Sequence, residues 1–163
     1  MSNRQNPPHL PIRRNTRLST YDYSSPGAYY VTICTEGRIP YFNQPELRFC
    51  LLELWQALPD RFPRVTLDEF VIMHDHVHGI LWLHGEDIKS PSLGDVIGAY
   101  KSLTTRAWLA YNKKLKIHIV SPLWQRGFHD HILRNEQDLT QKRQYIRDNP
   151  LKQIEREQGR GNP

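Results

Sequence analysis

The chain has 163 residues, a length that favours one domain with a hydrophobic core of its own. Its net charge of +5 and sequence pI of about 9.3 favour a polyanionic partner, nucleic acid before membrane, with a merely basic protein as the alternative. The sequence has no apolar run that could cross a bilayer and no secretory region, and Cys34 and Cys50 lack a metal-binding spacing, so we expect a cytoplasmic protein with reduced core cysteines.

Residues 1–20 are predicted to form an extended basic N-terminal arm, followed by a single domain over residues 21–152 and a polar C-terminal tail over residues 153–163. The arm has little to bury, because it combines several prolines with four arginines, Arg4, Arg13, Arg14 and Arg17. Such a segment is either a disordered tail or a strap that binds phosphate groups, and both interpretations stay open.

The first half of the domain is predicted to contain three strands and a helix. Residues 28–35 are rich in β-branched and aromatic side chains, which is typical of a strand. A leucine repeat of helical spacing predicts a helix over residues 44–58. Residues 65–73 and 76–83 are apolar runs with a short polar link, so they predict an antiparallel hairpin.

The second half repeats the alternation of helix and strand. Pairs of cap-like residues, a serine or asparagine followed three residues later by an aspartate, indicate where two further helices begin. Because Pro150 disfavours helical dihedrals in the residue before it, the last helix should end at Asn149. The elements predicted here are a helix from Ser92 and Asp95 into residues 113–116, a short strand at 117–120, a bent strand at 123–133 and a last helix from Asn135 and Asp138 through Asp148.

The predicted order is strand, helix, strand, strand, helix, strand, and then a further helix. This is the order of the ferredoxin-like split βαβ fold, an α+β architecture in which an antiparallel sheet carries two helices on one face. A C-terminal helix is added to it here. The fold by itself does not define a function, since RNA-binding modules and nucleases share it.

Two histidines on the predicted strand 76–83 are candidate metal ligands. Side chains alternate faces along a strand, so His76 and His78 share a face and their backbone positions lie about 7 Å apart. This spacing suits convergence on one divalent ion. His74 is in phase with the pair, but the predicted turn takes it off the sheet, which makes a three-histidine zinc site a secondary possibility.

The last helix carries a second group of candidate residues. Tyr145 and Asn149 are four residues apart and therefore share a helix face. They are either a packing tyrosine with a C-cap asparagine or, if this face meets the histidines, parts of an active site. A tyrosine phenolate beside a divalent ion could attack a phosphodiester. Residues that could then hold the DNA backbone are the arm arginines Arg13, Arg14 and Arg17 with Lys101, Arg106, Arg126 and Arg134.

These motifs resemble those of a known family. His76-Val77-His78 matches the His-hydrophobe-His signature of the HUH single-strand endonucleases, and the segment 145–150, YIRDNP, matches the Tyr-x-x-x-Asn-Pro block of their one-tyrosine branch. The chain most resembles the IS200-like transposases, in particular the REP-associated tyrosine transposases. The resemblance extends from about Arg13 to Lys152 and includes the segments 21–24, 26–35, 98–102, 123–126 and 130–132.

The resemblance implies a DNA transposase that cleaves and rejoins single-stranded DNA at hairpin elements, and so functions in DNA transposition and recombination. Tyr145 would be the nucleophile that forms a 5′-phosphotyrosine intermediate. His76 and His78, with Asn149 as the third ligand, would bind Mg²⁺ or Mn²⁺. Such a protein would be nucleoid-associated, with no membrane partner, and would act as a monomer or a homodimer.

One departure from the family pattern lies next to the histidine pair. The family usually has Met-Pro-Asn before it, whereas this chain has Met73-His74-Asp75. Aspartate is a good turn residue, so the turn should remain, but two further polar side chains are added near the metal site. The alternatives to a transposase are a non-catalytic ferredoxin-like protein that binds nucleic-acid hairpins, and a structural zinc protein that uses all three histidines.

Overall fold

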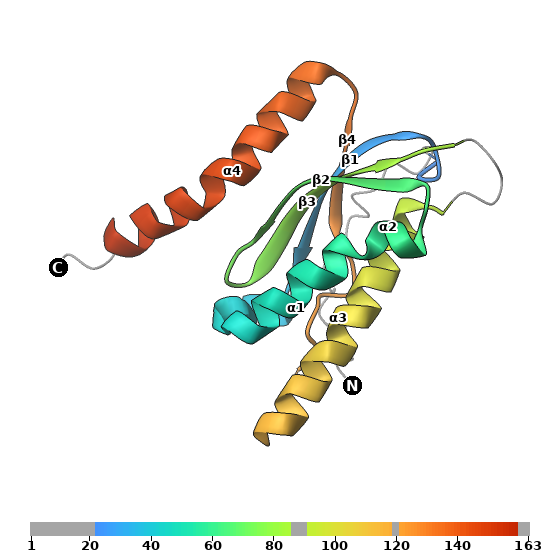
Figure 1. Cartoon of the computed structure of the whole chain (residues 1–163). Helices are drawn as coiled ribbons and strands as arrows, with labels where there is room; N and C mark the ends of the chain where they lie inside the picture. The colour runs from blue at the N-terminus through green and yellow to red at the C-terminus, as the bar shows by residue number, and fades with distance from the viewer. Residues whose placement is uncertain (1–21, 86–90, 119–120, 160–163) are drawn as a thin grey trace, which may run out of the picture.

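The computed structural model describes residues 22–85, 91–118 and 121–159, and the predicted basic arm with Arg13, Arg14 and Arg17 lies outside these ranges. Short 3-10 helices, η1 (Glu36–Arg38) and η2 (Tyr41–Asn43), follow the first strand. The main elements, shown in Figure 1, are β1 (Gly27–Cys34), α1 (Pro45–Gln56), α2 (Leu58–Arg61), β2 (Val65–Ile72), β3 (His76–Leu83), α3 (Leu93–Leu115), β4 (His129–Leu133) and α4 (Glu136–Gly159).

The four strands form one antiparallel sheet in the order β2-β3-β1-β4. The central strands β1 and β3 pair over their whole length, from Gly27 opposite Leu83 to Cys34 opposite His76. The edge strand β2 pairs with β3 through a hairpin, as its short polar link predicts. The α+β class and the ferredoxin-like split βαβ order are therefore confirmed.

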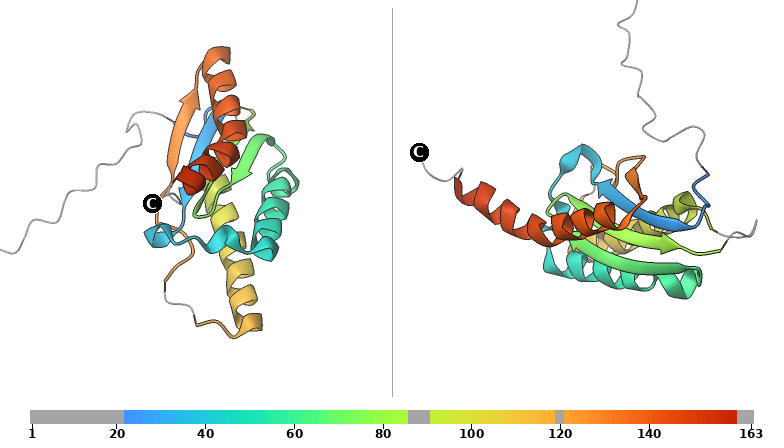
Figure 2. Two further views of the ribbon diagram at one scale, coloured as in Figure 1. Left: turned by 90° about the vertical axis from the view of Figure 1, so that its left-hand side faces the viewer. Right: turned by 90° about the horizontal axis from the view of Figure 1, so that it is seen from above.

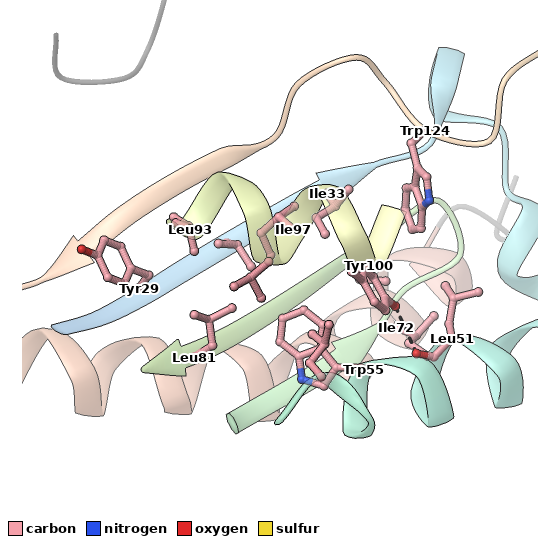
Figure 3. Close-up of a cluster of buried hydrophobic side chains, with 14 of the residues drawn as sticks. Tyr29, Ile33, Leu51, Trp55, Ile72, Leu81, Leu93, Ile97, Tyr100 and Trp124 are labelled. Carbon is pink, nitrogen blue, oxygen red and sulfur yellow. Dashed lines mark hydrogen bonds between the residues drawn. The ribbon is translucent and has the colours of Figure 1, made fainter. Parts of the chain in front are cut away.

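Helices cover both faces of the sheet (Figures 1 and 2). On one face α1 and α3 pack over the main core, whose large buried side chains include Trp55 and Tyr100 (Figure 3). The Tyr100 hydroxyl donates a hydrogen bond of 3.1 Å to the Leu51 carbonyl, so this buried polar group is satisfied. On the other face α4 buries Leu139 and Ile146 in a smaller apolar cluster.

A glycine lets α1 approach the sheet closely. A Cβ at Gly79 of β3 would lie 2.6 Å from a ring carbon of Trp55 and 3.2 Å from one of Phe70. The Trp55 and Phe70 rings stack here with their centroids 4.5 Å apart. No larger residue fits between this ring pair and the strand, which explains the glycine within an otherwise apolar run.

Both predicted helix caps are confirmed. Ser92 and Asp95 form a reciprocal capping box at the start of α3. Asn135 accepts a 2.8 Å hydrogen bond from the Asp138 amide at the start of α4.

The predicted end of the last helix is wrong. Instead of stopping at Asn149, α4 continues through Pro150 to Gly159, and its end projects past the sheet (Figure 2). Proline removes one hydrogen bond from the helix, but the residues after it include leucine, lysine, glutamate and arginine, which favour helix. Their propensity therefore outweighs the local effect of Pro150.

The segment predicted as a long bent strand is mostly loop. Only His129–Leu133 forms a strand, and Trp124 makes an isolated bridge to Thr35. The Lys101 ammonium donates hydrogen bonds to the carbonyls of residues 125, 126 and 127, which ties this loop to α3. Residues 117–118 form no strand, and the rest of that candidate lies outside the described residues.

The two cysteines do not share one environment. Cys34 is buried, as predicted, whereas Cys50 is exposed on α1, so the expectation of two core cysteines is half wrong. None of the helices in the described parts of the chain is long and apolar enough to cross a membrane.

Candidate active site

The two histidines of the His-x-His motif converge on the α4 side of the sheet. Val77 points into the main core, whereas His76 and His78 lie on the opposite face of β3. Their Nε2 atoms are 3.0 Å apart, and their rings are almost perpendicular. At this distance the two nitrogens share either a proton or a cation, because two lone pairs facing each other would repel.

Asp75 and Arg38 orient the first histidine. The Asp75 side chain is buried, and its Oδ1 lies 2.6 Å from Nδ1 of His76. A carboxylate can only accept, so Nδ1 donates and Nε2 presents its lone pair. Arg38 holds the other carboxylate oxygen at 2.8 Å. Burial lowers the pKa of His76, and the hydrogen bond to Asp75 opposes this only in part.

The second histidine is held from the neighbouring strand. Its Nδ1 lies 2.7 Å from the Tyr30 hydroxyl and 2.8 Å from the Thr32 hydroxyl, both on β1. Burial, with a further contribution from His76, lowers the pKa of His78 to about 3, so the imidazole is neutral at pH 7. Burial also raises the pKa of Tyr30 to about 12, which keeps its hydroxyl protonated.

The donor set fits a divalent ion. Two neutral imidazoles are the form that binds metals, and ligands about 2.1 Å from an octahedral ion and at right angles to each other are separated by about 3.0 Å. The Nε2 distance of His76 and His78 has this value. His74 contacts Asp75 instead, at 3.5 Å, and no group of three histidine, cysteine, aspartate or glutamate side chains forms a metal cluster in the described ranges. The three-histidine zinc site is therefore not formed among these residues.

The last helix brings Tyr145 to the histidine pair of the same chain. Its ring is 5.5 Å from that of His78 and 6.3 Å from that of Tyr30, centroid to centroid. Tyr145 is 43% exposed, so a substrate can reach it. Asn149 follows one turn later, and its side-chain amide donates a 3.0 Å hydrogen bond to the Tyr145 carbonyl. The amide oxygen stays available, and the role of Asn149 as a third ligand stays a prediction.

A β-bulge and two ion pairs hold α4 on this face. Asp68 and Glu69 of β2 together lie opposite the single residue Ile80, because the register shifts between Leu67 and Phe70. The bulge lets both carboxylates face α4. Arg143 donates to Asp68 at 2.6–3.2 Å, and Arg147, four residues later, donates to Glu69 at 2.9 Å through Nε.

The other predicted DNA-binding residues lie on α3 and on the segments before and after β4. Lys101 donates to the loop carbonyls described above, and Arg106 is exposed on α3, across the sheet from α4. Arg126 is exposed in the loop before β4, and Arg134 is exposed between β4 and α4. Their contacts with DNA stay predictions.

Sequence reasoning missed several residues of the site. The register of β1 against β3, which the sequence leaves open, places Tyr30 and Thr32 beside His78. Arg38 is the last residue of the 3-10 helix η1, which the sequence did not predict, and no sequence signal marks the bulge at Asp68. Helical spacing could have found Lys142, which lies three residues before Tyr145 and so shares its face.

Comparisons with known proteins relate this chain to one family. The model of a family described as IS200-like transposases matches residues 24–149. An uncharacterised protein of Haemophilus influenzae is 31% identical over 166 residues, covering 85% of this chain and 88% of its own. A second Haemophilus influenzae protein, described as a REP-associated tyrosine transposase, is 26% identical and covers 83% of this chain and 77% of its own.

Solved structures share the fold. One is a REP-associated tyrosine transposase bound to a REP hairpin, which matches with a TM-score of 0.60 at 21% identity, over 84% of this chain and 72% of that one. At this level of identity the likeness establishes the architecture alone.

Proposed function

Because the chain belongs to the IS200-like transposase family, we propose that it is a metal-dependent endonuclease that cleaves and rejoins single-stranded DNA at hairpin elements. The observation that carries the proposal is the position of Tyr145, whose ring lies 5.5 Å from that of His78 within one chain. A tyrosine beside two neutral imidazoles that could hold a divalent ion is an arrangement that can support phosphoryl transfer from DNA to tyrosine.

In the proposed reaction the Tyr145 oxygen attacks the scissile phosphorus. The new bond joins phosphorus to Oη, and the bond from phosphorus to the 3′ oxygen breaks. The phenol loses its proton to water and the leaving 3′ oxygen takes one from water, which gives a 5′-phosphotyrosine and a free 3′-OH. Attack by another 3′-OH on the phosphotyrosine then rejoins the strand and releases Tyr145.

We further propose that His76 and His78 hold Mg²⁺ or Mn²⁺, with the amide oxygen of Asn149 completing the protein ligands. The ion would polarise the non-bridging oxygens of the scissile phosphate. Asp75 supports this role, since its hydrogen bond to Nδ1 aims the Nε2 lone pair of His76 away from the carboxylate and toward His78.

Hairpin DNA is the proposed substrate, because a solved relative with the same fold is bound to a REP hairpin. The basic character of the chain supports a polyanionic ligand. A single chain carries both the nucleophile and the histidine pair, so one protomer is sufficient for the chemistry in this proposal.

Covalent capture tests the proposal. The protein is incubated with 5′- and 3′-labelled hairpin single-stranded DNA and Mn²⁺, and denaturing gels should reveal a protein–DNA adduct that carries the 3′ label, because Tyr145 is joined to the 5′ end of the downstream fragment. Tyr145→Phe should abolish the adduct without weakening DNA binding, and His78→Ala should abolish the metal-dependent part. Hairpin binding without any adduct, at several metal concentrations, would instead support a non-catalytic hairpin-binding protein.

A further inference from the structure

Lys142 lies one helical turn before the proposed nucleophile. Its ammonium nitrogen is 4.7 Å from the centroid of the Tyr30 ring and 5.8 Å from that of the Tyr145 ring. Residues three apart share a helix face, so Lys142 and Tyr145 both face the histidine side of the sheet. The Tyr30 hydroxyl in turn lies 2.7 Å from Nδ1 of His78, so Tyr30 contacts both the ammonium and the candidate metal pair.

The arginines around the site are committed to other partners. Arg38 is paired with Asp75, Arg143 with Asp68 and Arg147 with Glu69. Lys142, by contrast, has no carboxylate partner among the side chains that the structure describes. Aromatic faces attract a cation without neutralising its charge, so the two rings position the ammonium and leave it able to bind an anion.

Other contacts already hold α4 on the sheet. They are the two ion pairs with β2 and the burial of Leu139 and Ile146. A half-buried lysine that loses side-chain entropy on aromatic rings, and pairs with no carboxylate among the described residues, is better explained by a ligand. The ligand expected beside Tyr145 is the phosphate that it attacks.

We propose that Lys142 is a catalytic residue that donates a hydrogen bond to a non-bridging oxygen of the scissile phosphate. This role rests on the proposed function. As the bond to Oη forms and the bond to the 3′ oxygen breaks, negative charge on the phosphoryl oxygens rises, and a fixed ammonium stabilises it. Lys142 remains protonated throughout, and no proton is transferred to or from it.

The test compares Lys142→Gln and Lys142→Arg with the wild type. Single-turnover adduct formation is measured at saturating hairpin DNA and Mn²⁺, and DNA affinity is measured separately. Removal of one such donor lowers the rate by about 100- to 1,000-fold, so Lys142→Gln should show this loss with little change in affinity. Lys142→Arg should recover most of the rate. Lys113→Gln, which removes an exposed lysine from α3, is the matched control and should leave the rate unchanged.

A substrate with a neutral methylphosphonate at the scissile position separates charge recognition from packing. With no anionic oxygen to bind, the ratio of wild-type to Lys142→Gln rates should fall to near one. An undiminished ratio would assign Lys142 a packing role and overturn the proposal. If neither protein cleaves the methylphosphonate linkage, the role of Lys142 is judged from the rates on the natural linkage and from the recovery of the rate in Lys142→Arg.

The outcomes also distinguish this inference from the proposed function. A normal wild-type adduct with Lys142→Gln at full rate overturns the role of Lys142 alone. A loss of rate that arginine does not restore, accompanied by a lower unfolding temperature, overturns it as well. A wild type that forms no adduct overturns the function and this role together.

Discussion

The ion pair between Arg143 and Asp68 should dominate the docking of α4, and its strength can be worked out from the structure. Arg143 donates three hydrogen bonds of 2.6–3.2 Å to a carboxylate that is only 13% exposed. A hydrogen bond to a buried charged group contributes roughly 1.5–3 kcal/mol, and the 32% exposure of the arginine lowers this. We therefore expect Arg143→Gln to weaken α4 docking by about 2 kcal/mol.

The neighbouring pair supplies a control on the same helix. Arg147 is 59% exposed and Glu69 is 28% exposed, so solvent screens their attraction. Exposed pairs contribute about 0.2–1 kcal/mol, and Arg147→Gln should therefore cost about a quarter of the Arg143 effect.

Native-state hydrogen exchange distinguishes the two variants. Because α4 packs on the outside of the sheet, it should open locally before the core unfolds. A loss of 2 kcal/mol corresponds to exchange about 30-fold faster for the α4 amides in Arg143→Gln, against about two-fold in Arg147→Gln. The same acceleration in both variants, or faster exchange spread evenly over β1 and β3, would refute the assignment of docking to the Asp68 pair.

Three further predictions concern strand β3 and Asp75, the residue before it. Asp75→Ala should weaken Mn²⁺ binding by about 10- to 100-fold, measured by calorimetry, because His76 loses the acceptor that fixes its tautomer; unchanged affinity would contradict this. His78 has a folded pKa of about 3, below its ordinary 6.5, so the unfolded chain binds more protons and metal-free stability should fall as the pH drops from 6.5 toward 3. The free energy of unfolding, measured by urea titration, should fall more steeply in the wild type than in His78→Asn, by up to about 1.4 kcal/mol per pH unit. The same dependence of unfolding free energy on pH in the two proteins would argue against a buried neutral imidazole. Gly79→Ala should cost about 1–3 kcal/mol in urea unfolding, since its Cβ meets the Trp55 ring at 2.6 Å, and a midpoint equal to wild type would show that the ring moves freely.

Much of the fold could be predicted because its signals are local. Alternating side chains placed His76 and His78 on one face of β3, and capping residues marked the starts of α3 and α4. The order of elements then limited the topology to a split βαβ sheet. The end of α4 could not be predicted in this way, because the effect of Pro150 competes with the helix propensity of the leucine, lysine, glutamine, glutamate and arginine residues that follow it.

The features that complete the site depend on contacts distant in sequence, and these follow no periodicity. Asp68 and Glu69 are adjacent, so regular alternation would put them on opposite faces of β2 and leave only one able to reach α4. The bulge opposite Ile80 turns both toward the helix, where two arginines one turn apart can bind them. One additional residue in an edge strand thus fixes where α4 docks, and with it the distance from Tyr145 to His78.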